Sequence, residues 1–233
     1  NKILIGGDFY LSDEFIGIGE GMWGELEGMI TDADAFILNV EAPLTTASNE
    51  INKTGPAIKM NPDLLEQMFI NPNTIATLAN NHIKDFGDQG ILDTLQYLNA
   101  RGIKSVGAGS NIDEAREALR VNIGSKIISI INTCESEWCG VDESSGANTL
   151  HLSSLYNQIK ISKLETDFVF VIIHGGSEYY SLPSPKRQEL YRLIVDFGAD
   201  AIVSHHSHCV SGHEYYKGCP IIYSIGNLIF PIK

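Results

Sequence analysis

The residues of this chain best suited to chemistry are potential metal ligands that follow short apolar runs. The densest group is His205-His206-Ser207-His208, directly after the apolar residues 201–203. So many imidazoles at the end of a buried segment are rarely only structural, because each needs a polar partner. Four further apolar runs end in the same way, at Asp8, at Glu41, at Asn81 with His82, and at His174. Carboxylate, amide and imidazole groups without a thiolate suit Mn²⁺, Zn²⁺ or Fe²⁺.

These groups outnumber the ligands that one ion requires, so we expect two divalent ions that share a bridging carboxylate. Two ions about 3.5–4 Å apart can activate a water and stabilise the leaving oxygen of a phosphoryl group. They would also attract a phosphate to a chain that has 16 Lys and Arg against 29 Asp and Glu, a net charge of −13. The same acidity argues against nucleic acid as a partner, because such binding depends on Lys and Arg.

Each of these ligands also has a structural interpretation. Asp8 follows two glycines and is placed to cap a turn, while Glu41 fits a solvated loop. Asn80 and Asn81 are common loop residues, and His174 before two glycines fits a hydrogen-bonded turn. The metal interpretation is favoured because these groups occur together at five strand ends, where polar side chains need a partner.

The remaining histidines and the cysteines lack that context. His151 and His213 are predicted to be surface or packing residues, and Cys209 is better placed as a buried thiol than as a ligand. The four cysteines form no C-x-x-C pair, so two disulfides and four thiols are both open. The size of the chain favours thiols, because a core this large rarely needs disulfides.

The elements that must position these residues alternate between strands and helices. Strands are expected at residues 2–5, 35–40, 74–78, 126–131, 168–173, 201–204 and 220–224. Helices are expected at 62–69, 89–100, 113–119 and 184–197, with a loop at 142–148. This alternation predicts an α/β fold with a largely parallel sheet. Ligands of such sheets bind beyond the carboxyl ends of the strands, where the candidate residues stand.

The chain shows no internal repeat and no linker, so we expect one domain over residues 1–233. Its longest apolar runs, 127–131 and 168–173, fall far below the roughly 20 residues of a membrane-spanning helix. No transmembrane segment is therefore predicted. No signal peptide is visible, and because the sequence opens on an apolar strand pattern without Met, the removal of an upstream segment stays open.

Six ordered motifs resemble the bacterial capsule-synthesis CapA family, which includes the PgsA protein of poly-γ-glutamate synthesis. The motifs are Gly7-Asp8, the segment 39–45 (NVEAPLT), the segment 78–82 (LANNH) with Asp85-Phe86-Gly87, the segment 174–179 (HGGSEY), the segment 205–208 (HHSH) and the segment 222–230 (IYSIGNLIF). They span nearly the whole chain. The resemblance implies the fold of the calcineurin-like metallophosphoesterases, a four-layer α/β/β/α sandwich with a dinuclear metal centre.

The resemblance also implies a role for each residue. Asp8 and His208 would bind the first ion, Glu41 would bridge, and Asn81, His174 and His206 would bind the second. His82 would stand beside the phosphate as a general acid or a transition-state donor. Residues expected to neighbour the ligands or the substrate are Tyr10, Asn39, Asn80, Glu178, His205 and Asn227.

One departure affects the first ion site. The wider superfamily has a histidine two residues after its first aspartate, where this chain has Tyr10. The first site therefore loses one imidazole, which would weaken it or leave it empty.

Three functions follow from these observations. The leading hypothesis is a metal-dependent phosphoesterase or related hydrolase acting on an anionic glycan, lipid-linked or nucleotide intermediate of surface-polymer synthesis. The first alternative is a non-catalytic protein of the capsule-synthesis machinery that binds polymer through a degenerate metal site. The second is a hydrolase of poly-γ-glutamate amide bonds. The resemblance favours the cell envelope, periplasm or extracellular space, and the residues leave a cytoplasmic location open.

Overall fold

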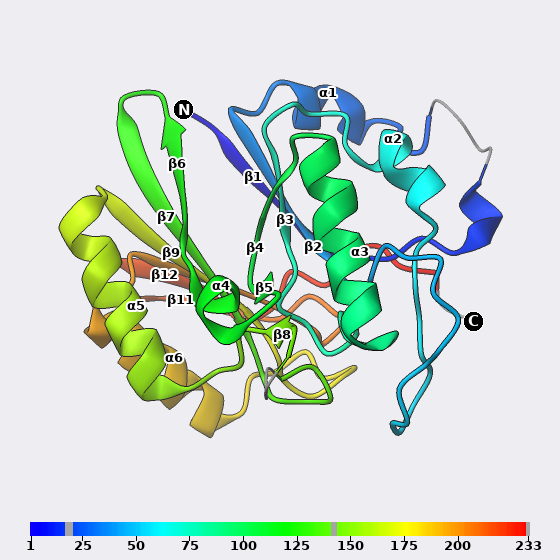
Figure 1. The fold of residues 1–233 in the computed structure, drawn as a ribbon. Coiled ribbons are helices and arrows are strands. Elements are labelled where there is room, and N and C mark those ends of the chain that lie inside the picture. Colours follow the sequence, from blue (N-terminus) through cyan, green and yellow to red (C-terminus); the bar gives the residue numbers. More distant parts are fainter. Residues whose placement is uncertain (17–20, 141–143, 232–233) are drawn as a thin grey trace.

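Two β-sheets form the centre of the structure, a computed structural model that describes residues 1–16, 21–140 and 144–231 (Figure 1). The first sheet is wholly parallel, in the order β13-β1-β2-β3-β4. Its strands are β1 (Ile3–Phe9), β2 (Ala35–Val40), β3 (Thr74–Thr77), β4 (Lys104–Val106) and β13 (Asn227–Ile229). A parallel sheet needs cover on both faces, which the helices and the other sheet provide.

The second sheet has the order β11-β12-β10-β9-β7-β6. Its inner strands run parallel, and antiparallel strands close both edges. The strands are β6 (Leu119–Ile123), β7 (Lys126–Cys134), β9 (Phe168–His174), β10 (Ala201–His205), β11 (His213–Tyr216) and β12 (Cys219–Ile222). A short ribbon joins β5 (Ala108–Gly109) to β8 (Gly146–Ala147).

Helices cover the outer face of each sheet (Figure 1). On the first sheet lie α1 (Leu26–Thr31), α2 (Leu65–Met68) and α3 (Gly87–Ala100), with the short 3₁₀ turns Asp13–Phe15 and Pro62–Leu64 nearby in sequence. On the second lie α5 (Leu152–Glu165) and α6 (Pro185–Phe197), while α4 (Ile112–Arg116) packs beside β5 and β8. The result is the expected four-layer α/β/β/α sandwich.

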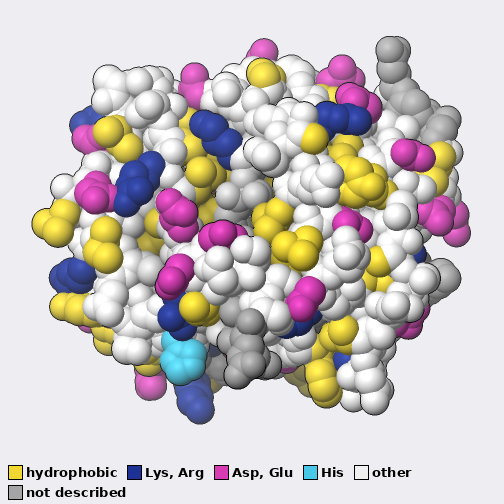
Figure 2. All heavy atoms as spheres, in the orientation of Figure 1, with side chains coloured by type: hydrophobic (Ala, Val, Ile, Leu, Met, Phe, Trp, Pro, Cys, Tyr) yellow, Lys and Arg dark blue, Asp and Glu magenta, His cyan; other side chains and the backbone are white. Residues whose placement is uncertain are grey.

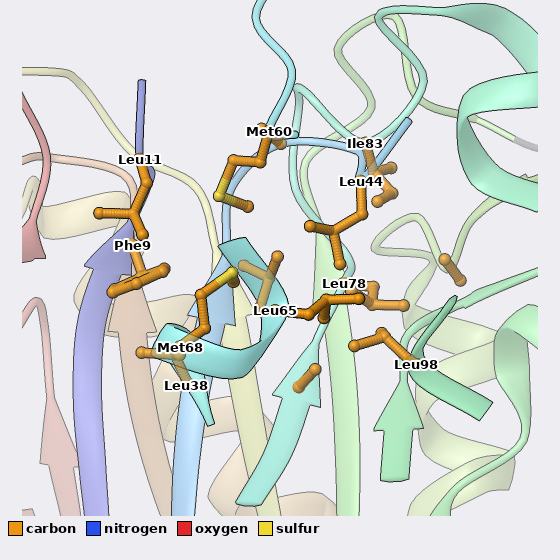
Figure 3. Packing of buried hydrophobic residues seen from close by; sticks show 14 of the residues in the cluster. Phe9, Leu11, Leu38, Leu44, Met60, Leu65, Met68, Leu78, Ile83 and Leu98 are labelled. Atoms are coloured by element: carbon orange, nitrogen blue, oxygen red, sulfur yellow. The ribbon is translucent and has the colours of Figure 1, made fainter. Parts of the chain in front are cut away.

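Strand alternation divides the apolar core into three layers. In β2, Phe36 and Leu38 pack toward the helices of the first sheet, whereas Ala35 and Ile37 face the space between the sheets. Figure 3 shows the helix side of this arrangement, where Met68 and Leu65 lie over the strands. Because successive strand residues point to opposite faces, one buried strand serves two of these layers. Burial on both faces explains why the strands read as continuous apolar runs.

The expected strands and most expected helices are present with small changes in their ends. The helix expected at 62–69 becomes a 3₁₀ turn followed by α2, and the Asn61 side chain caps it by accepting a hydrogen bond from Asp63 N, 3.0 Å away. No helix among the described residues is long and apolar enough to cross a bilayer.

Two expectations were wrong in part. The helix expected at 113–119 ends at Arg116, because Glu117 turns to extended backbone and Leu119 begins β6, which pairs antiparallel with β7. The loop expected at 142–148 contains the strand β8, and its residues Asp142 and Glu143 lie outside the described residues. Helices α1 and α5 were not predicted.

Close approach of β1 to β13 requires a glycine. A Cβ atom at Gly7 would lie 2.0 Å from the carbonyl oxygen of Gly226, the atom that accepts a hydrogen bond from Asp8 N at 3.0 Å. The register of β1 against β2 shifts between Ile5 and Asp8, as in a β-bulge. Such irregularities re-aim side chains next to functional sites, and this one precedes the aspartate of the candidate centre.

We predict that Gly7→Ala lowers the free energy of unfolding by about 1–3 kcal/mol, because neither backbone has room to move. The matched control is Gly28→Ala in α1, where a Cβ meets nothing within 4 Å. That change should leave stability unchanged or raise it by about 0.5–1 kcal/mol. Urea unfolding of both variants measures the difference, and equal stabilities would contradict the packing described here.

Candidate metal centre

Six candidate ligands from both sheets converge at one edge of the sandwich. Ligand atoms of Asp8, Glu41 and His208 lie within 4.8 Å of one another, and so do those of Glu41, His174 and His206. Asp8 lies near the end of β1, Glu41 follows β2, His174 ends β9, and the other two histidines follow β10. Glu41 belongs to both groups and is therefore placed to bridge two ions.

Histidine nitrogens surround the Glu41 carboxylate closely. Glu41 Oε1 lies 3.5 Å from His174 Nε2 and 3.7 Å from His208 Nε2. His174 Nε2 also lies 3.1 Å from His206 Nδ1 and 3.0 Å from Asn81 Oδ1. Carboxylate, imidazole and amide groups thus meet around His174 Nε2, and Asn81 lies beside the second group.

Neither oxygen of the Glu41 carboxylate has a hydrogen-bond partner among the described residues, although the side chain is completely buried. Burial raises the pKa of Glu41 well above its ordinary value, and the nearby Asp8 raises it further. An unpaired buried carboxylate is costly unless a cation lies beside it. The residues present therefore fit a pair of divalent cations.

Burial favours the neutral form of two candidate ligands, His174 and His206, and the neutral imidazole is the form that binds metals. Burial lowers the pKa of His174 well below its ordinary value, and the neighbouring His206 and His205 lower it further. Burial likewise lowers the pKa of His206. These histidines are thus ready to ligate at neutral pH without first losing a proton.

Hydrogen bonds from neighbouring residues fix the orientation of the ligands. Asn39 Nδ2 donates to Asp8 Oδ1 at 2.6 Å and lies 3.1 Å from His174 Nδ1. The backbone N–H of His206 donates to Asp8 Oδ2 at 3.0 Å, and Asn227 Oδ1 lies 2.8 Å from His208 Nδ1. Such contacts leave the Nε2 atoms of His174 and His208 directed to Glu41. Asn39 and Asn227, expected near the ligands, do lie there.

Two other expected neighbours hold the backbone. His205 Nε2 lies 3.1 Å from the carbonyl oxygen of Gly6 and so connects the second sheet to the first. Asn80 donates from Nδ2 to the carbonyl oxygen of Val40 at 2.8 Å, and its Oδ1 accepts from His82 N at 3.1 Å. These contacts fix the loops that carry Glu41 and Asn81.

Backbone conformation at the centre is unusual. His206 and His208 have φ values of 92° and 55°, and Tyr179 has a φ of 61°. Residues other than glycine rarely adopt a positive φ, which costs about 1–3 kcal/mol per residue. Such backbone strain clusters at functional sites. The Tyr179 ring lies 5.9 Å from the ring of His208 and is largely exposed. Residue types alone gave no signal for this strain.

His82 is held by a buried pair of charges that was not predicted from the sequence. Its Nδ1 lies 2.7 Å from Asp85 Oδ2 and 3.1 Å from Lys53 Nζ, and Lys53 forms an ion pair with Asp85. The Asp85 side chain is completely buried, and it also accepts from Ile58 N at 2.9 Å. Asp85 occurs in a motif used for the resemblance, but the position of Lys53, on a distant loop, had no sequence signal.

Other residues considered from the sequence do not belong to the two ligand groups. The Tyr10 ring packs 5.4 Å from the ring of Phe230. Glu178 is exposed, and its charge raises the pKa of Glu41 and opposes the lowering at His206. Cys209 Sγ lies 3.7 Å from Ser207 Oγ. His151 and His213 are exposed, as expected.

Residues 2–232 match the profile of the family described as "Bacterial capsule synthesis protein PGA_cap". The chain belongs to this capsule-synthesis family. A "Probable polyglutamine synthesis accessory protein" of Mycobacterium tuberculosis is 29% identical over 223 residues, covering 89% of this chain and 59% of the relative. The "Capsule biosynthesis protein CapA" of Bacillus anthracis is 32% identical over 164 residues, covering 67% of this chain and 40% of that protein. The chain therefore spans about half the length of these relatives.

Solved structures confirm the fold class of this PGA_cap chain. A structure described as a novel phosphatase of Mycoplasma pneumoniae aligns with a TM-score of 0.59 at 15% identity, covering 97% of this chain and 71% of that one. A protein of Thermus thermophilus aligns with a TM-score of 0.58 at 14% identity, covering 97% and 76%. At these identities the similarity establishes a phosphatase-like fold and carries no residue roles.

Glu41→Gln should have opposite effects on stability with and without metal. The pKa of Glu41 is raised in the folded state. The metal-free protein therefore loses stability as the pH rises above about 4.3, the pKa of a glutamate in the unfolded chain. At pH 8 with a chelator, Glu41→Gln should therefore unfold at a higher temperature than the unmodified chain. With Mn²⁺ at about 100 times its Kd, the unmodified chain should gain about 2.7 kcal/mol and the variant much less.

Thermal unfolding at pH 4.5 and pH 8 measures both effects. At pH 4.5 the advantage of the variant should shrink, since Glu41 is then largely protonated. A variant that is destabilised at both pH values without metal would contradict the assignment of an unpaired buried carboxylate.

Proposed function

We propose that this chain is a metal-dependent hydrolase of the phosphoesterase type that acts on an anionic intermediate of capsule or other surface-polymer synthesis. The observation that carries the proposal is Glu41, a buried carboxylate without partners that is shared by two groups of potential ligands. The phosphatase-like fold supports the reaction type. Membership of the capsule-synthesis family supports the pathway.

The first ion would be held by Asp8, Glu41 and His208, and the second by Glu41, Asn81, His174 and His206. When bound, a pair of divalent cations neutralises phosphoryl charge and lowers the pKa of a water. We favour Mn²⁺, Zn²⁺ or Fe²⁺, because the donors are oxygen and imidazole nitrogen. Asn39 and the backbone N–H of His206 hold Asp8 in place for this role.

His82 would protonate the leaving oxygen or donate a hydrogen bond to it. Its Nδ1 faces the Asp85 carboxylate and donates to it, so a proton for a substrate is present on Nε2 only when the ring is an imidazolium. Asp85 orients the ring and stabilises this imidazolium, and Lys53 balances the buried charge of Asp85. His82 contributes no atom to the two ligand groups, so its role can be separated from metal binding.

The position of Tyr10 favours the alternative of a non-catalytic, polymer-binding protein, because the first ion loses one imidazole. We nevertheless favour the hydrolase. Three protein ligands remain for that ion, and catalytic sites keep positions open for water and substrate. A dinuclear centre also polarises carbonyl groups, so poly-γ-glutamate is a necessary second substrate in the assay.

We predict that the protein hydrolyses 4-nitrophenyl phosphate in the presence of Mn²⁺ and that this hydrolysis stops when a chelator is added. His82→Ala should lower kcat by about 10²- to 10⁴-fold while the folded protein still binds metal. The matched control, His151→Ala, removes an exposed histidine and should leave kcat unaffected.

Folded, metal-loaded protein that cleaves neither the phosphate ester nor polyglutamate would contradict the proposal. Cleavage of polyglutamate alone would replace the phosphoester substrate by an amide. A His82→Ala variant with full activity would remove His82 from the mechanism.

A further inference from the structure

A small cavity lies directly beside the candidate centre. Its volume is about 180 Å³, and its lining includes Gly175, Gly176 and Ser207. The two glycines directly follow the ligand His174, and Ser207 stands between the ligands His206 and His208. The lining of the cavity therefore includes direct sequence neighbours of three ligands, on the same two loops as the candidate centre.

The charged residue that lines this cavity is Arg187 on α6, and its side chain is only 16% exposed. Arg187 Nη2 donates to Glu135 Oε1 at 2.7 Å, and Nη1 donates to Tyr191 OH at 3.0 Å. Glu135 Oε2 in turn accepts from Gly176 N at 3.1 Å. The guanidinium is therefore fixed against the loop that follows His174.

Arg187 retains donors for a ligand. Its guanidinium packs against Gly176, where an added Cβ would lie 3.3 Å from Arg187 Cζ. Among the described residues, its side-chain hydrogen bonds go to Glu135 and Tyr191, so further N–H groups remain. A planar guanidinium matches the geometry of carboxylate and phosphate groups.

The rest of the lining also suits an anion. Ser177 and Ser184 contribute hydroxyl groups that can donate to it, whereas the hydroxyls of Ser207 and Ser211 already donate to backbone carbonyl oxygens. The described lining contains no carboxylate. Ser184 caps α6, a helix of 13 residues, so the positive end of its dipole adjoins the cavity.

A larger cavity of the described residues provides a contrast. It measures about 670 Å³, and its lining carries the carboxylates Asp13, Glu14 and Glu50 against the single cation Lys59. An anion is repelled there and attracted beside Arg187. The face drawn in Figure 2 shows acidic and basic side chains interspersed, without a broad basic patch that could compete for it.

We propose that the cavity beside Arg187 is a subsite for a second anionic group of the substrate, a carboxylate or a phosphate. This deepens the proposed function and rests on it in one respect, that the cleaved phosphoryl group binds at the adjacent centre. The substrate class is then a phosphoester whose remaining part carries another negative charge. Glu135 offsets part of the charge of Arg187, so the geometry of the hydrogen bonds contributes more to anion binding than long-range electrostatic attraction does.

Binding to metal-free protein tests the subsite without any need for activity. Isothermal titration with glutarate and with inorganic phosphate should show binding of at least one probe, and the tighter one identifies a carboxylate or a phosphate. Arg187→Met should weaken binding by about tenfold or more, as expected for loss of charge-assisted hydrogen bonds. Arg120→Met, which breaks an exposed pair with Glu165, should leave binding unchanged.

A second pair of variants guards against misfolding of Arg187→Met. Ser177 is exposed and lines the cavity, so it tolerates substitution. Ser177→Asp adds a negative charge, whereas Ser177→Asn has the same shape without it. The aspartate variant should bind about tenfold more weakly than the asparagine variant. Equal binding by these two variants, or failure of both probes to bind, would overturn the subsite.

Kinetics then connect the subsite to catalysis. The unmodified chain should prefer 2-carboxyphenyl phosphate over phenyl phosphate in kcat/KM, through a lower KM, and Ser177→Asp should abolish that preference. A preference that survives in Ser177→Asp overturns the subsite. If neither ester is cleaved while probe binding still depends on Arg187 and Ser177, the subsite stands and the proposed function fails.

Discussion

The buried carboxylate of Glu41 is the constraint on which the rest of the site depends. It lies where neither oxygen finds a hydrogen bond among the described residues, and where Asp8 adds a second negative charge nearby. An unpaired buried charge destabilises a folded protein strongly, so such an arrangement is rare unless another group balances the charge. Its presence is understandable if cations balance it. The imidazoles around it are the groups that would hold those cations.

At this edge of the sandwich, candidate ligands from the two sheets meet. The first sheet supplies Asp8 and Glu41, and the second supplies His174, His206 and His208. Contacts between the sheets keep these halves in register, including the one from His205 to the carbonyl oxygen of Gly6. Local strain at His206 and His208 is tolerated because the surrounding packing fixes both residues. The rigid packing of the layers therefore fixes the positions of the candidate ligands.

Much of this arrangement could be predicted from the sequence, because buried parallel strands read as apolar runs and their ends gather at one edge. The run at 35–40 matched β2 to the residue, and Glu41 follows it directly. Helix α5 escaped prediction because only Leu155, Ile159 and Ser162 of its residues are fully buried, which leaves a faint helical pattern. Lys53 escaped because its partner Asp85 is distant in sequence and brought near only by folding. The register shift before Asp8 lies between β1 and β2, and the one after Asp8 depends on β13, a strand from the far end of the chain.

The most direct measurement is anomalous diffraction from crystals grown with Mn²⁺, recorded on both sides of the metal absorption edge. Two peaks are predicted, one among Asp8, Glu41 and His208 and the other among Glu41, Asn81, His174 and His206. Each should lie about 2.0–2.3 Å from its ligand atoms, with Glu41 contacting both. Peaks elsewhere in the molecule, or no peak within reach of Glu41, would contradict the account.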